Sequence, residues 1–121
     1  MYSAQVLDHF EHPRNAGALK EPDARAEIEN PACGDTLQLT LKIVAGRIEE
    51  IGFLARGCVA SMACASALTE LARGRSLTQA RQLRREEILK ALGGLPPASI
   101  HASHLAFDAL KAALDQVARK A

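Results

Sequence analysis

The stretch that decides the fold is Thr36-Leu37-Gln38-Leu39-Thr40-Leu41-Lys42-Ile43. Apolar and polar side chains alternate in it, which is the period of a β-strand that buries one face. Ala45 and Gly46 then favour a tight connection into a second, antiparallel strand at residues 47–56. We expect a third short strand at residues 25–30. The sequence therefore predicts a small three-stranded antiparallel sheet.

The chain on either side of these strands has helical periodicity. Residues 3–11 predict a short amphipathic helix behind a Ser3 N-cap, and a helix is expected between Gly57 and Gly74. Residues 77–92 predict two shorter helices, and residues 99–120 a long final one. Strands followed by helices indicate an α+β fold in which the sheet packs against helices. We expect one domain over residues 1–121.

Composition and charge exclude several classes of function. The 121 residues are 48% hydrophobic and carry a formal charge of +1, which provides no electrostatic footprint for nucleic acid. No apolar run reaches the roughly 18 residues of a membrane span, and no signal peptide is evident, so we expect a soluble cytoplasmic protein. The basic residues between positions 73 and 90 predict a solvated helix face, with a partner-docking patch as the alternative.

Cysteine usage points away from disulfides. The three cysteines, Cys33, Cys58 and Cys64, are an odd number in a chain without a secretion signal. Cys33 and Asp35 are two residues apart, so in an extended segment their side chains project from the same side and can reach one metal ion. Gly34 between them permits a turn.

Two further candidates lie at predicted helix starts. Cys58 follows Gly57 where a strand meets a helix, and free N–H groups and the helix dipole there favour a thiolate; the alternative is a small buried residue at a corner. His101 follows the rigid Pro96-Pro97 turn, which would hold its imidazole in place as a ligand, although a histidine of no special function is the alternative.

Together Cys33, Asp35, Cys58 and His101 offer two soft sulfurs, a nitrogen and an oxygen. These are the donor types expected for tetrahedral zinc or for iron in a cluster. Cys64 stands six residues after Cys58, about 240° around an ideal helix and roughly 9 Å along it. We therefore expect Cys64 to be buried and not to share a metal with Cys58.

Short motifs spread over nearly the whole chain form one combined pattern. They are Tyr2-Ser3, Asp8-His9-Phe10-Glu11-His12-Pro13-Arg14-Asn15, Pro31-Ala32-Cys33-Gly34-Asp35, Gly57-Cys58, Leu68-Thr69-Glu70 and Leu95-Pro96-Pro97. In these motifs the chain resembles the U-type iron-sulfur cluster scaffolds, which are IscU, SufU and the N-terminal domain of NifU. The short spacing from Cys58 to His101 makes IscU the nearer relative. The resemblance implies a scaffold that receives sulfur from a cysteine desulfurase, assembles a 2Fe-2S cluster and passes it to recipient proteins.

The resemblance also implies a ligand set. In the family three cysteines, an aspartate and often a histidine surround the cluster or a zinc ion, and Cys33, Asp35, Cys58 and His101 match four of these positions. The third family cysteine, the usual persulfide acceptor, follows the histidine, and here that position is Ala102. The family segment Leu-Pro-Pro-x-Lys, read by a dedicated Hsp70-type chaperone, ends here in Ser99, which argues against that chaperone as a partner.

Three functions follow from these residues. The favoured one is a non-enzymatic scaffold or carrier for a 2Fe-2S cluster or iron, with zinc as a possible substitute. The second is a divergent zinc-binding or metal-free member with a structural or regulatory role. The third is an enzyme that uses Cys58 as nucleophile, His101 as base and Asp35 as orienter.

Overall fold

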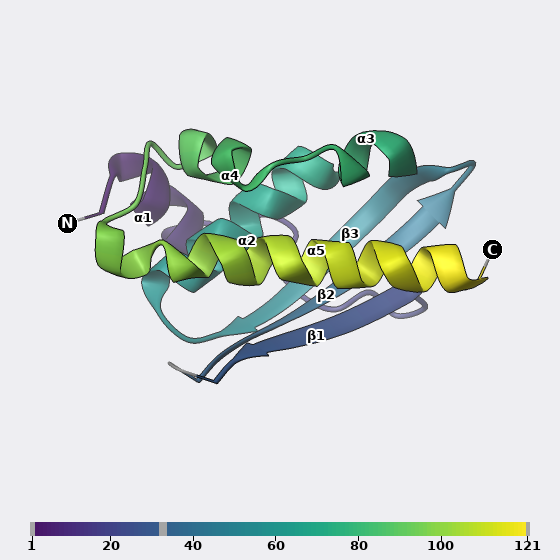
Figure 1. Ribbon diagram of the computed structural model, residues 1–121, viewed down its shortest axis with the longest axis horizontal. Coiled ribbons are helices and arrows are strands. Elements are labelled where there is room, and N and C mark those ends of the chain that lie inside the picture. Colours follow the sequence, from purple (N-terminus) through teal and green to yellow (C-terminus); the bar gives the residue numbers. More distant parts are fainter. Residues whose placement is uncertain (1, 32–33, 121) are drawn as a thin grey trace.

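The computed structural model describes residues 2–31 and 34–120, and it confirms the α+β fold (Figure 1). The elements in chain order are α1 (Ala4–Glu11), β1 (Ala24–Asn30), β2 (Asp35–Val44), β3 (Arg47–Arg56), α2 (Val59–Ala72), α3 (Leu77–Arg81), α4 (Arg85–Ala91), the 3₁₀ helix η1 (Pro97–Ser99) and α5 (His101–Lys120). Within the described part of the chain, no helix combines the length and the apolarity that crossing a membrane requires.

The sheet has the order β1-β2-β3, and both pairs of neighbouring strands are antiparallel. Leu39 at the centre of β2 pairs with Ala26 on one side and Phe53 on the other. Ala45 and Gly46 join β2 to β3 with φ angles of 52° and 74°. Two positive φ angles match the right-handed twist of a hairpin, so the tight connection expected from the sequence is present.

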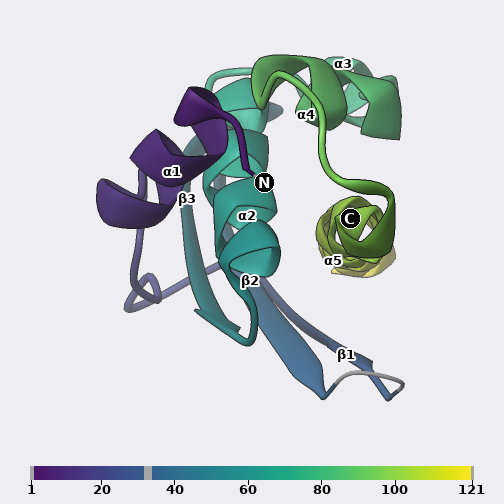
Figure 2. The same ribbon diagram turned by 90° about the vertical axis from the view of Figure 1, so that its left-hand side faces the viewer.

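Helices α2 and α5 lie side by side over one face of the sheet (Figure 2). Helix α2 packs on β3, α5 packs on β1 and β2, and α1 and α4 contact α2 from outside. Helix α2 is thus buried on almost every side. Val59 and Met62 are only half-buried, whereas Ala60, Ser61 and Cys64 are buried. The small side chains let neighbouring elements approach α2 closely.

Part of the segment between α1 and β1 adds to the sheet. The Gly17 N–H donates to the Phe53 carbonyl at 2.8 Å, and the Phe53 N–H donates to the Asn15 carbonyl at 3.1 Å. Gly52 permits this approach, because a Cβ there would lie 2.3 Å from the Gly17 carbonyl oxygen. The loop therefore covers the outer edge of β3, which would otherwise offer unpaired backbone groups.

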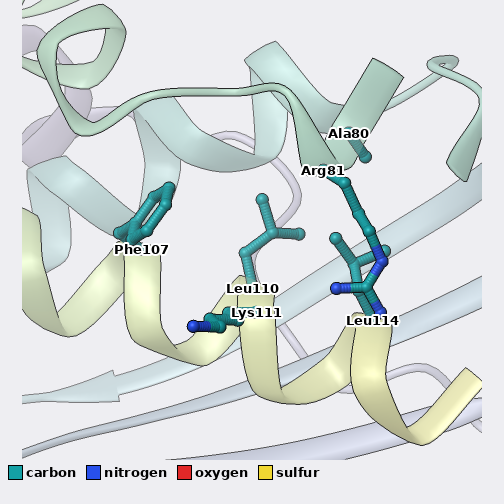
Figure 3. A pocket seen from close by; sticks show the side chains of 6 residues that line it. All are labelled: Ala80, Arg81, Phe107, Leu110, Lys111 and Leu114. Atoms are coloured by element: carbon teal, nitrogen blue, oxygen red, sulfur yellow. The ribbon is translucent and has the colours of Figure 1, made fainter. Parts of the chain in front are cut away.

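Helix α3 contacts the later turns of α5 (Figure 3). Arg81 Nη2 lies 2.9 Å from Asp115 Oδ1, and a hollow of about 230 Å³ remains beside this ion pair, lined by Ala80, Leu110 and Leu114 among others. Leu110 is nine residues beyond the start of α5, or about 13 Å along the helix axis. The hollow is therefore separate from the start of α5, where the candidate site lies.

Candidate metal centre

Three predicted site residues come together at one end of the molecule. Asp35 is the first residue of β2, Cys58 is the N-cap of α2, and His101 is the first residue of α5. One ligand atom from each lies within 4.8 Å of the other two. The ends of these elements meet on the same side of the fold (Figure 1). Cys33, the fourth predicted ligand, lies outside the described residues, so its place in the site stays a prediction.

The Asp35 carboxylate is the centre of this group. It is buried, with 5% of the residue exposed. Its Oδ2 accepts a hydrogen bond from the Ser61 hydroxyl at 2.6 Å and lies 3.4 Å from Cys58 Sγ. His101 Nε2 is 3.7 Å from the same oxygen. An oxygen, a sulfur and a nitrogen donor therefore face one small region.

Gly57 makes room for this carboxylate. Its φ of +145° lies in the region that favours glycine, and a Cβ at this position would stand 2.2 Å from Asp35 Oδ1. A side chain here would push the carboxylate out of place, since real Cβ contacts are never that short. The Gly57-Cys58 pair thus has two roles: the glycine admits Asp35 and the cysteine supplies a thiol beside it.

The His101 side chain directs its Nε2 toward Asp35 and Cys58. Its Nδ1 lies 3.1 Å from the Ala98 carbonyl oxygen, which can only accept, and this assigns the ring hydrogen to Nδ1. The other nitrogen, Nε2, is buried and has no hydrogen-bond partner within residues 2–31 and 34–120. An imidazole fixed through Nδ1, with its Nε2 lone pair free, is the arrangement seen in metal-binding histidines.

The donor set therefore fits a metal ion or a cluster. Thiol sulfur, imidazole nitrogen and carboxylate oxygen are the ligands of zinc sites and of iron held by a mixed set of donors. A buried imidazole nitrogen without a partner is costly unless something binds it. Asp35, Cys58 and His101 therefore supply the donor atoms for a metal, and a bound metal would give the buried His101 Nε2 a partner.

Sequence reasoning missed Ser61 and the role of Gly57. Ser61 stands three residues after Cys58 on α2, so the two lie on the same side of the helix, and their Oγ and Sγ atoms are 3.4 Å apart. The spacing of three residues between Cys58 and Ser61 in a predicted helix was the signal that could have identified Ser61. His104 and Asp108, further along α5 from His101, are both exposed.

Cys64 and Ala102 are both fully buried. Burial raises the pKa of the Cys64 thiol to about 12, so this cysteine stays protonated near neutral pH. The expectation that Cys64 is a core residue is confirmed. Ala102 directly follows His101, and its methyl group packs in the core, where the resemblance places a cysteine in other members.

Comparison with known proteins identifies the family of this fold. The model of the NifU-like N terminal domain matches residues 1–121. The chain belongs to this family of NifU-like N-terminal domains. The family resemblance expected from the sequence motifs is therefore confirmed.

Several members of the NifU-like family are close in sequence or structure. Iron-sulfur cluster assembly scaffold protein IscU 1 of Archaeoglobus fulgidus is 42% identical over 120 residues, which are 99% of this chain and 78% of the relative. The IscU scaffold protein of Haemophilus influenzae is 41% identical over 117 residues, 93% of this chain and 92% of the relative. The crystal structure of the N-terminal part of a NifU-like protein from Brucella abortus superposes with a TM-score of 0.81 at 23% identity, covering 98% of this chain and 95% of that one. This last match shows the shared fold.

Proposed function

We propose that this protein is a scaffold or carrier on which an iron-sulfur cluster is assembled and from which it is passed on. The observation that carries the proposal is the convergence of Asp35, Cys58 and His101, whose ligand atoms lie within 4.8 Å of one another. The relatives named as IscU scaffold proteins, which match almost the whole chain, support it. In this proposal the cluster is cargo, and the protein is not an enzyme.

We assign the chain's own residues the following parts. Cys58 supplies a soft sulfur to iron, His101 supplies Nε2, and Asp35 supplies one carboxylate oxygen. Cys33, two residues before Asp35, is proposed as the fourth ligand. A cysteine desulfurase is the proposed sulfur source and cluster-recipient proteins the proposed acceptors. The Ser99 that replaces the family lysine argues against a dedicated Hsp70-type chaperone.

The hydrogen bonds of His101 argue against the enzymatic alternative. A nucleophile–base–orienter triad needs the carboxylate on one ring nitrogen and the nucleophile at the other. Here Nδ1 bonds to the Ala98 carbonyl, and Asp35 faces Nε2. Asp35 and the proposed cargo site therefore lie on the same side of the imidazole, which suits shared ligation better than a proton relay.

Purification without oxygen, followed by reconstitution with iron and sulfide, tests the proposal. We expect a coloured protein with iron and acid-labile sulfide in equal amounts, and loss of most of the colour in Cys58→Ser and His101→Ala. His104→Ala is the matched control, since His104 is an exposed histidine on the same helix. A chain that takes up neither iron nor sulfide would contradict the proposal.

Zinc binding without a cluster is the second candidate function. Position 102 carries a buried alanine, so the described site has fewer sulfur donors than the family pattern. A site with few thiolates and an imidazole also suits a single zinc ion. Stoichiometric zinc together with no sulfide uptake in the same experiment would favour this structural or regulatory role over the scaffold.

A further inference from the structure

Within residues 2–31 and 34–120, Ser61 carries a hydroxyl that touches two of the proposed ligands. Its Oγ donates to Asp35 Oδ2 at 2.6 Å and lies 3.4 Å from Cys58 Sγ. The residue is 2% exposed, and it stands on the first turn of α2, one turn after the N-cap Cys58. Neither the sequence motifs nor the family resemblance assigned it a part.

We propose that Ser61 is a positioning residue that holds the Asp35 carboxylate in its metal-binding orientation. The Ser61 hydroxyl binds Oδ2, and the lack of a Cβ at Gly57 leaves room for Oδ1, so the hydroxyl holds an orientation that the glycine permits. Oδ2 is also the oxygen that faces Cys58 and His101. Ser61 therefore sets the direction of the oxygen donor relative to the sulfur and nitrogen donors.

The chemistry of a carboxylate ligand explains why this hydroxyl matters. An ionised carboxylate oxygen has more than one lone pair, so Oδ2 can keep the Ser61 hydrogen bond while it binds a metal. Loss of that donor removes a hydrogen bond from a buried carboxylate, which costs free energy and removes a restraint on the direction of Oδ2. Loss of such a supporting hydrogen bond typically weakens metal binding about 10- to 100-fold.

A second buried serine on the same helix serves as a control. Ser66 accepts a hydrogen bond from the Arg14 N–H at 2.8 Å and is hydrogen-bonded to His9, again at 2.8 Å. These bonds attach α1 and the loop that follows it to α2, and they do not involve Asp35, Cys58 or His101. Ser66→Ala thus removes a buried hydroxyl from α2 and leaves the site untouched.

The inference rests on the proposed function, because it concerns a ligand of the proposed cargo site. Its test is a titration of the metal-free full chain with Co²⁺. The absorbance of the thiolate-to-cobalt charge-transfer band measures how much Co²⁺ is bound. We expect Ser61→Ala to weaken Co²⁺ binding at least tenfold, and Ser66→Ala to bind within about threefold of the native chain. Helical circular dichroism of each variant confirms that it is folded.

A shape-matched pair isolates the hydroxyl. Ser61→Thr keeps the oxygen and Ser61→Val replaces it with a methyl group of the same shape, so both add the same bulk to α2. We expect the Thr variant to bind Co²⁺ at least tenfold more tightly than the Val variant. If Ser61→Ala does not fold, the comparison of these two variants tests the inference in its place.

Equal affinities in the Thr and Val variants, or an equal loss in Ser66→Ala, would overturn the inference and leave the proposed function standing. A native chain that gives no charge-transfer absorbance with Co²⁺ would overturn the proposed ligand set itself, and the positioning role with it.

Discussion

At the scale of single residues, Gly57 has two reasons to be glycine. Its φ is +145°, and a Cβ would lie 2.2 Å from Asp35 Oδ1. We predict that Gly57→Ala lowers the free energy of unfolding by about 1–3 kcal/mol through backbone strain, and weakens Co²⁺ binding because the carboxylate must move. Urea denaturation and the cobalt titration measure the two effects.

Gly94→Ala is the control for strain alone, since Gly94 has a φ of +91° and no atom within 4 Å of its would-be Cβ. It should lose stability and keep its Co²⁺ affinity. If Gly57→Ala binds Co²⁺ like the native chain, the fit between Gly57 and Asp35 is not needed for the site.

Ala102 determines how sulfur can arrive. A persulfide needs a sulfur nucleophile, which a methyl group cannot supply. We predict that incubation with a cysteine desulfurase and cysteine yields little persulfide on the native chain, as read by mass spectrometry. In the native chain Cys58 is the best substitute acceptor, because its sulfur already belongs to the site.

Cys64 is the control in the persulfide experiment. Its thiol is fully buried, and its pKa is raised to about 12, so it provides almost no thiolate. Cys64→Ala should leave the level of persulfide unchanged. Abundant persulfide on native Cys64 would show that sulfur enters through the core and would contradict this account.

At the scale of elements, α1 is attached to α2 through His9. This side chain is 6% exposed, its Nδ1 is hydrogen-bonded to Ser66 at 2.8 Å, and its Nε2 lies 3.6 Å from Glu70. Burial, and secondarily the Arg14 charge, lower the pKa of His9 below its usual 6.5, although Glu70 and Asp8 act in the opposite direction. The folded chain therefore keeps His9 neutral at pH values where the unfolded chain protonates it.

This difference sets the direction of a pH effect. As the pH falls through 6.5, the unfolded state takes up a proton that the native state resists, so the free energy of unfolding decreases. We predict that the free energy of unfolding falls as the pH is lowered from neutral to below 6.5, the usual pKa of histidine. In His9→Gln this fall should be smaller. Urea denaturation at each pH measures both. His12→Gln, at an exposed position, should keep the native slope. Identical slopes in His9→Gln and the native chain would exclude His9 as the cause.

At the scale of the whole molecule, the candidate site joins elements that are distant in sequence. Asp35, Cys58 and His101 begin β2, α2 and α5, and an unfolded chain does not hold them together. A metal that binds only the native state stabilises it by about 2.7 kcal/mol when its concentration is 100 times Kd. We predict a rise in Tm when Zn²⁺ is added.

The rise in Tm should disappear in Cys58→Ser and persist in His104→Ala, because His104 is exposed on α5 outside the site. Thermal unfolding followed by circular dichroism measures both. An equal rise in Cys58→Ser would show that zinc binds elsewhere on the chain.

The local pattern of residues was enough to predict the elements and the candidate ligands. Alternation in residues 36–43 predicted β2, the Ala45-Gly46 pair predicted its hairpin, and the two shorter helices expected over residues 77–92 are α3 and α4. These features depend on neighbours in sequence, so a single sequence carries them. Cys58 and His101 were identified in the same way, from residue type and from their place at helix starts.

Only the tertiary structure decided what those residues meet. Three features depend on contacts between distant segments. They are the burial of α2 on almost every side, the pairing of residues 15–17 with Phe53, and the hydrogen bond from Ser61 to Asp35. Hydrophobic periodicity reports which face of an element is apolar and says nothing of the element that covers it. The His101 bond to Ala98 is local, but the approach of Nε2 to within 3.7 Å of Asp35 Oδ2 joins the start of α5 to the start of β2. The sequence alone therefore determined which candidate donor types the chain carries, and packing determined how Asp35, Cys58 and His101 are oriented toward one another.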